Sequence, residues 1–95
     1  MKKSSPRRKA YRFSGKNPRT MPRVEITWLD ACVSGGWKNI ETCQREESLI
    51  ECVAVGLLTR RDAKEIQIVQ QASPDKVSDS LTIPTSCVKR MRRLR

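Results

Sequence analysis

The sequence predicts a mainly β domain with one short helix, preceded by a basic N-terminal arm. Apolar and polar residues alternate at several places after Val24, and turn-forming residues separate these stretches. Charge is also divided along the chain. Residues 1–23 hold nine Lys or Arg and no acid, and residues 88–95 hold five and no acid, whereas residues 24–87 hold six bases and ten acids. A mildly acidic body with two cationic ends is therefore expected.

The chain length allows one domain, expected over residues 23–95. Residues 1–22 combine three prolines with Ser, Gly, Asn and many bases, and they cannot bury enough apolar surface to offset the entropy of ordering. We expect them to form a disordered arm. Its two aromatic residues, Tyr11 and Phe13, would stack on bases, remain exposed, or pin the arm to the domain.

The first strand is predicted over Arg23–Leu29, because apolar residues there alternate with polar ones. Gly35-Gly36 is expected to supply a positive φ angle. A short helix over 40–47 follows, and Ile40 and Cys43 are expected to face the core.

A hairpin is predicted next. Residues 49–59 form an apolar run, a polar turn covers 60–64, and residues 65–71 form the partner strand. Gly56 interrupts the apolar run, which indicates a bend, a bulge or a close backbone approach.

The end of the chain contains a loop over 72–79, a short strand over Leu81–Ile83 stopped by Pro84, and a turn of 3₁₀ helix at Thr85–Cys87. Residues 88–94 fit either a last strand with a bulge or a terminal helix turn.

This order of elements resembles a small five-stranded SH3-like or Sm-like β-barrel. In such barrels a short fourth strand ends at a 3₁₀ turn, and the last strand returns to the first. The resemblance is carried by the ending Ile83-Pro84, Val88, Met91 and Leu94.

A narrower pattern is similar to small uncharacterised proteins of tailed bacteriophages. It covers about residues 24–94 and implies a phage origin, hence the host cytoplasm, with no established activity. The pattern consists of Val24, Ile26, Trp28, Asp30-Ala31, Gly36-Trp37, Val55-Gly56 and Ile83-Pro84.

Composition argues against catalysis, a cofactor and a membrane span. The chain has no histidine, which removes the commonest general base and the His-dependent nucleophile systems. Its four cysteines include no C-x-x-C pair, so no metal site is expected, and Cys52 and Cys87 are predicted to act as small buried hydrophobes. No run of apolar residues is long enough to cross a membrane. We expect a non-enzymatic cytoplasmic protein.

The basic ends predict binding to RNA or DNA with low sequence specificity, because Lys and Arg contact phosphates without reading bases. The hairpin turn would extend this surface. The candidate residues are Lys2, Lys3, Arg7, Arg8, Lys9, Tyr11, Arg12, Phe13, Lys16, Arg19, Arg60, Arg61, Lys89, Arg90, Arg92 and Arg93.

The alternative is a protein-interaction module that docks on a host or phage protein through an exposed strand edge or the region of Trp28 and Trp37. A third hypothesis is an Sm-like ring, which requires pairing between the fourth and fifth strands of neighbouring copies. A monomer is the favoured state.

Overall fold

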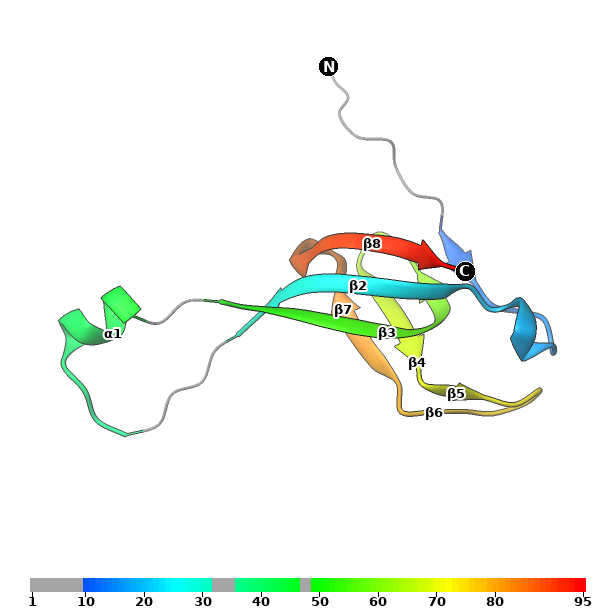
Figure 1. Cartoon of the computed structure of the whole chain (residues 1–95), viewed down its shortest axis with the longest axis horizontal. Helices are drawn as coiled ribbons and strands as arrows, with labels where there is room; N and C mark the ends of the chain where they lie inside the picture. The colour runs from blue at the N-terminus through cyan, green and yellow to red at the C-terminus, as the bar shows by residue number, and fades with distance from the viewer. Residues whose placement is uncertain (1–9, 32–35, 47–48) are drawn as a thin grey trace, which may run out of the picture.

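The computed structural model describes residues 10–31, 36–46 and 49–95, and it confirms a mainly β chain with antiparallel strands and one short α-helix (Figure 1). The main sheet has the order β7-β4-β3-β2-β8, and β1 also pairs with β3; β5 and β6 form a separate pair. The elements are β1 (Tyr11–Arg12), η1 (Pro18–Thr20), β2 (Arg23–Asp30), α1 (Ile40–Glu46), β3 (Ile50–Arg61), β4 (Glu65–Val69), β5 (Gln71–Ala72), β6 (Val77–Ser78), β7 (Leu81–Pro84), η2 (Thr85–Cys87) and β8 (Val88–Leu94).

The first predicted strand, β2, lies between β3 and β8. Its residue Glu25 is opposite Val55 of β3 and Arg92 of β8, and Ile26 is opposite Met91 of β8. The expected return of the last strand to the first is therefore confirmed. A register shift beside Thr27 also confirms the bulged-strand alternative for the end of the chain.

The core follows from the alternation of apolar residues along these strands. Alternate side chains of a strand lie on the same face of the sheet, and full burial of an apolar side chain contributes about 1.5–3 kcal/mol. The core cluster consists of Val24, Ile26, Leu58, Ile66, Ile68, Ile83 and Met91.

Gly56 lies where β3 passes closest to β4. A Cβ atom built at this position would lie 2.9 Å from the carbonyl oxygen of Val69 and 3.1 Å from the Cβ of Ile68. The close backbone approach predicted for Gly56 is confirmed, and the register shift of this hairpin lies a little further on, between Leu58 and Arg60.

The structure corrects the prediction of a disordered arm over residues 10–22. Here β1 pairs with the end of β3, and the Asn17 side chain caps η1 by accepting from the N–H of Arg19 at 3.0 Å. Met21 is only 2% exposed. The composition of residues 10–22 does not reveal that they are ordered, because the strands that stabilise them lie far away in the sequence. Residues 1–9 lie outside the described residues.

The predicted helix exists as α1, but the prediction that Ile40 and Cys43 face the core is wrong. Ile40 is 76% exposed and Cys43 is also exposed. Figure 1 shows the reason: α1 lies at the far end of the β2–β3 hairpin, away from the rest of the sheet. Gly36, at φ 84°, has the positive φ angle that was expected before Trp37.

The predicted loop over 72–79 is partly wrong, because it contains strand pairing. Residues of β5 and β6 face each other, with Gln71 opposite Ser78 and Ala72 opposite Val77. The short fourth strand and the 3₁₀ turn are confirmed as β7 and η2.

Candidate nucleic-acid interface

The chain segment before β2 and the end of β8 meet at one end of the sheet, opposite α1 (Figure 1). Antiparallel pairing of β2 with β8 produces this meeting, because Arg23 at the start of β2 is opposite Leu94 at the end of β8. The η1 turn is held beside them because Met21 is buried and the N–H of Leu58 donates to the carbonyl oxygen of Pro22 at 2.8 Å.

A groove of about 480 Å³ lies at this junction, and arginines dominate its lining. Of the aspartates and glutamates that the structure describes, none lines the groove or forms an ion pair with these arginines. Guanidinium groups bind phosphate oxygens with paired N–H donors. The groove is lined by Arg19, Thr20, Met21, Pro22, Arg23, Arg93, Leu94 and Arg95.

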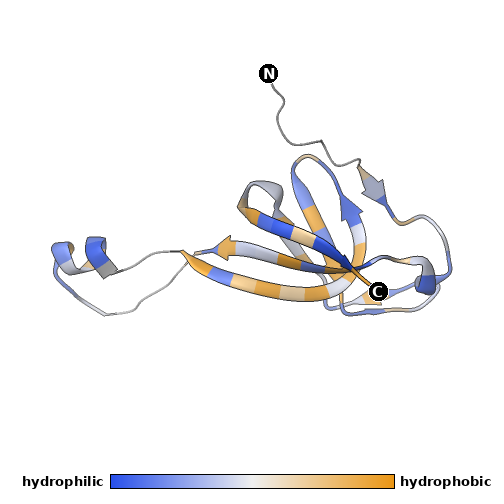
Figure 2. Ribbon diagram, turned by 45° about the horizontal axis from the view of Figure 1, so that its top comes forward, coloured by the Kyte–Doolittle hydropathy of each residue, from blue (hydrophilic) through white to orange (hydrophobic). Residues whose placement is uncertain are grey.

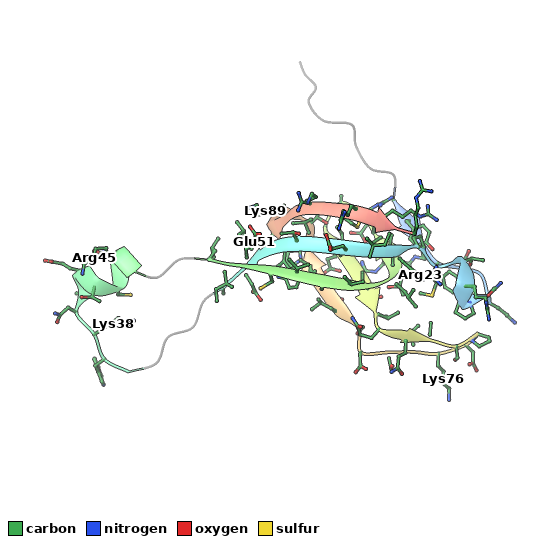
Figure 3. The ribbon with its side chains drawn as sticks, in the orientation of Figure 1. Arg23, Lys38, Arg45, Glu51, Lys76 and Lys89 are labelled. Atoms are coloured by element: carbon green, nitrogen blue, oxygen red, sulfur yellow. The ribbon has the colours of Figure 1, made fainter. Side chains whose placement is uncertain are left out.

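Two of the β8 cations have carboxylate partners instead. Lys89 donates to Glu51 of β3 at 2.7 Å, and Arg92 donates through Nε to Glu25 of β2 at 2.8 Å. The hydrogen bond from Lys89 lowers the pKa of Glu51, and the bond from Arg92 lowers the pKa of Glu25. Figure 3 shows Lys89 and Glu51 beside each other on neighbouring parts of the sheet. These two cations are therefore less available to a phosphate than the groove arginines.

In the turn between β3 and β4, Arg60 is also paired with carboxylates. Arg60 donates to Asp62 at 2.8 Å and to Glu65 at 3.0 Å, and both contacts raise the pKa of Arg60, with Glu65 as the larger cause. The other oxygen of Asp62 accepts from the backbone N–H groups of Glu65 and Lys64, which lowers the pKa of Asp62. These hydrogen bonds among Arg60, Asp62, Lys64 and Glu65 stabilise the turn. Arg61 has interaction partners as well.

The aromatic candidates have different surroundings. Tyr11 is half-buried and packs against the core cluster, which favours the alternative in which it pins the N-terminal segment to the domain. The backbone N–H of Phe13 donates to the carbonyl oxygen of Thr59 at 2.8 Å, and the Phe13 side chain is also half-buried. Stacking of these rings on bases stays a prediction.

The remaining candidates are placed as follows. Arg12, Lys16 and Arg90 are exposed, while Lys2, Lys3, Arg7, Arg8 and Lys9 lie outside the described residues. The groove brings together two candidates, Arg19 and Arg93, with two residues that sequence reasoning missed, Arg23 and Arg95. The sequence analysis expected the first strand to pair with the last. In an antiparallel pair the start of one strand lies beside the end of the other, so this expectation already implied that Arg23 lies beside the C-terminal arginines.

A second groove, of about 460 Å³, has an apolar lining. It lies between the distal end of β2, β7 and η2, and Trp28, Leu81, Ile83 and Cys87 contribute to it. Trp37, by contrast, is fully exposed near α1. The protein-docking alternative, through an exposed strand edge or the region of Trp28 and Trp37, stays a prediction.

Within the residues that the structure describes, no three His, Cys, Asp or Glu side chains gather as a metal site would require, and no helix is long and apolar enough to span a membrane. Cys52 and Cys87 carry free thiols; both are half-buried rather than buried as expected, and Cys87 packs against the core.

Comparison with family models, with curated proteins and with solved structures finds no match to this chain. The similarity to tailed-bacteriophage proteins has no support from these comparisons and stays a prediction. Function must therefore be inferred from the surface itself.

Proposed function

We propose that this protein is a non-catalytic nucleic-acid-binding protein whose phosphate contacts centre on the groove of Arg19, Arg23, Arg93 and Arg95. This proposal rests on one observation: arginines from both ends of the folded chain line one groove, and no described Asp or Glu side chain lines it. Phosphate is the ligand that fits, because it is anionic and accepts several N–H donors at once.

The groove also includes part of the basic segment over residues 1–23. Arg19 and Arg23 belong to that segment, and both line the groove. A phosphate backbone lying in the groove would contact the end of β8 and the N-terminal segment together. Binding of this kind depends on charge, and we expect low sequence specificity.

We also propose that the five longer strands belong to a small SH3-like or Sm-like barrel. The order β7-β4-β3-β2-β8, the glycine in the longest strand and the 3₁₀ turn before the last strand support this reading. In such an arrangement the arginine groove lies at the end where β2 begins and β8 ends.

Fluorescence anisotropy with mixed-sequence duplex DNA and RNA over a salt series tests the binding proposal. The groove variant is Arg23→Gln with Arg93→Gln. The control is Arg45→Gln with Lys76→Gln, which removes the same charge from exposed residues on α1 and beside β6, away from the groove (Figure 3). The groove variant should bind more weakly and reduce the slope of log K against log salt by about 2 on duplex DNA, because each lost phosphate contact contributes about 0.9.

The control should keep nearly the whole slope of the unmodified protein. Equal loss of affinity in the two variants would show that net charge, and not the groove, determines binding. Unchanged binding by the groove variant at low salt would also contradict the proposal. A second variant with Lys2, Lys3, Arg7, Arg8 and Lys9 replaced by Gln measures what the N-terminal cations add.

A further inference from the structure

Part of β3 has a strand neighbour on one side only. Residues 50–57 pair with β2, but β4 joins the opposite side of β3 only from Leu57 onward. Among the described residues, no strand covers the β4 side of residues 50–56. Figure 1 shows this stretch of β3 extending past the end of β4. A strand edge left open in this way offers backbone donors and acceptors to another chain.

The structure identifies the residues whose backbone groups face this open edge. Gln70 donates through Nε2 to the carbonyl oxygen of Val55 at 3.0 Å, from the β4 side. Because backbone groups of alternate residues point the same way along a strand, those of Val53 and Glu51 face the open edge as well. Leu58 lies three residues after Val55, so its backbone groups should face the opposite side of the strand. Its N–H does donate toward the β2 side, to the carbonyl oxygen of Pro22, which agrees with this alternation.

The side chains beside the open edge are mostly apolar. Val53 is 58% exposed and Val55 is 48% exposed, and Figure 2 shows the apolar colouring of β3 continuing along the hairpin. Glu51 already forms an ion pair with Lys89 at 2.7 Å. Proteins usually protect an open edge with Lys, Pro or a bulge, and residues 50–56 contain none of these.

We propose that this edge binds the same edge of a second copy of the chain, in an antiparallel dimer with its two-fold axis at Val53. This arrangement would join the sheets of the two copies through β3. The backbone of Val53 would exchange two hydrogen bonds with Val53 of the second copy, and the N–H of Val55 would reach the carbonyl oxygen of Glu51. The carbonyl oxygen of Val55 keeps its bond from Gln70.

A second copy fits because the edge is complementary to itself. With the axis at Val53, the two exposed Val53 side chains contact each other, and each Val55 lies beside the aliphatic part of the opposite Glu51. No like charges are directly opposed, and both sides contribute β-branched residues. The proposal does not depend on nucleic-acid binding and differs from the monomer that the sequence favoured.

Sedimentation equilibrium of the nuclease-treated full chain in high salt tests the dimer, because salt removes nucleic-acid bridging while apolar and backbone contacts persist. The unmodified protein should have the mass of two chains. Val53→Lys, which replaces the apolar contact between the two Val53 side chains with two hydrated ammonium groups, should raise the dimer dissociation constant at least about tenfold even in high salt. Val77→Lys is the matched control, since Val77 is 52% exposed on β6, and it should remain dimeric.

Circular dichroism of Val53→Lys should match the unmodified protein, because the side chain is exposed. A monomer for the unmodified chain at high micromolar concentration overturns the proposal. Dimers that persist unchanged in Val53→Lys also overturn it, since they would be formed by another surface.

Discussion

Gly56→Ala tests how closely β3 and β4 approach. The added Cβ would lie 2.9 Å from the carbonyl oxygen of Val69 and 3.1 Å from both Cβ and Cδ1 of Ile68. The oxygen belongs to the backbone of a paired strand and cannot rotate away, so β3 must shift. Overpacking of this kind costs about 1–3 kcal/mol. For a domain of this size, about 1 kcal/mol lowers Tm by about 4–8 °C, which gives an expected loss of roughly 5 to 20 °C.

Gly15→Ala is the matched control. Its Cβ would meet only the Cε1 atom of Phe13, at the ordinary contact distance of 3.7 Å. The same substitution also reduces the entropy of the unfolded chain, which can stabilise a protein by about 0.4–1 kcal/mol where the native conformation allows it. Gly15→Ala should therefore be neutral or slightly stabilising.

Thermal and urea unfolding, followed by circular dichroism, compare the two variants with the unmodified protein. The denaturant midpoint should fall for Gly56→Ala without a change in the m value, because the native fold is kept. If Gly56→Ala were as stable as Gly15→Ala, the close approach of the Val69 carbonyl to β3 would be refuted.

Two further changes test the N-terminal segment and the β3–β4 turn. Met21→Ala should cost about 2–5 kcal/mol in urea unfolding, because Met21 is 2% exposed; a loss below about 0.5 kcal/mol would mean that the segment before β2 is not part of the fold. Asp62 has a lowered pKa in the folded protein, so its ionised form stabilises the fold above the unfolded pKa, and that contribution disappears as pH falls through the folded pKa. Asp62→Asn should therefore be less stable than the unmodified protein near neutral pH, and the difference should shrink as the pH falls through the range in which the Asp62 carboxyl takes up its proton; a difference independent of pH would contradict the role of the charge.

The elements that were predicted well are those whose own residues show a local pattern, such as apolar alternation or a proline at a strand end. The alternation of Val24, Ile26 and Trp28 gives β2, and Pro84 ends β7 because proline cannot donate to a strand ladder. Gly56 was recognised as special, although the sequence left bend, bulge and close approach open. Distinguishing them requires knowledge of Val69, the residue that comes close, and this depends on the register of β3 with β4.

The elements that were missed depend on partners distant in the sequence. Met21 has a polar, proline-rich neighbourhood that resembles a disordered segment, and only the surrounding strands bury it. The reverse error occurred at α1, where Ile40 has the spacing of an inward residue but no core lies beside it. Helical spacing identifies a face, whereas burial depends on what the fold places against that face.

The candidate site shows the same dependence at the level of charge. The sequence located the cations at the two ends and indicated that only part of the set Lys89, Arg90, Arg92 and Arg93 shares one face, but it did not show which of them meet carboxylates. Strand register separates them: Lys89 and Arg92 meet carboxylates of β3 and β2, while Arg93 lines the groove. No composition rule could make this distinction.

The position of the groove arginines affects how strongly this surface would attract an anion. An exposed cation attracts phosphate weakly when a carboxylate lies beside it, because the opposite charges largely cancel at the phosphate and salt screens the remaining field beyond a Debye length of about 8 Å. Pairing of β2 with β8 places Arg23 next to the end of β8. Arginines more than 60 positions apart in the sequence therefore line the same groove. Under the proposed function, two separate basic ends would each bind a polyanion weakly, whereas their convergence in one groove would let a single phosphate backbone contact both segments. The antiparallel pairing of β2 with β8 is therefore what gathers the basic residues of the two ends into one groove.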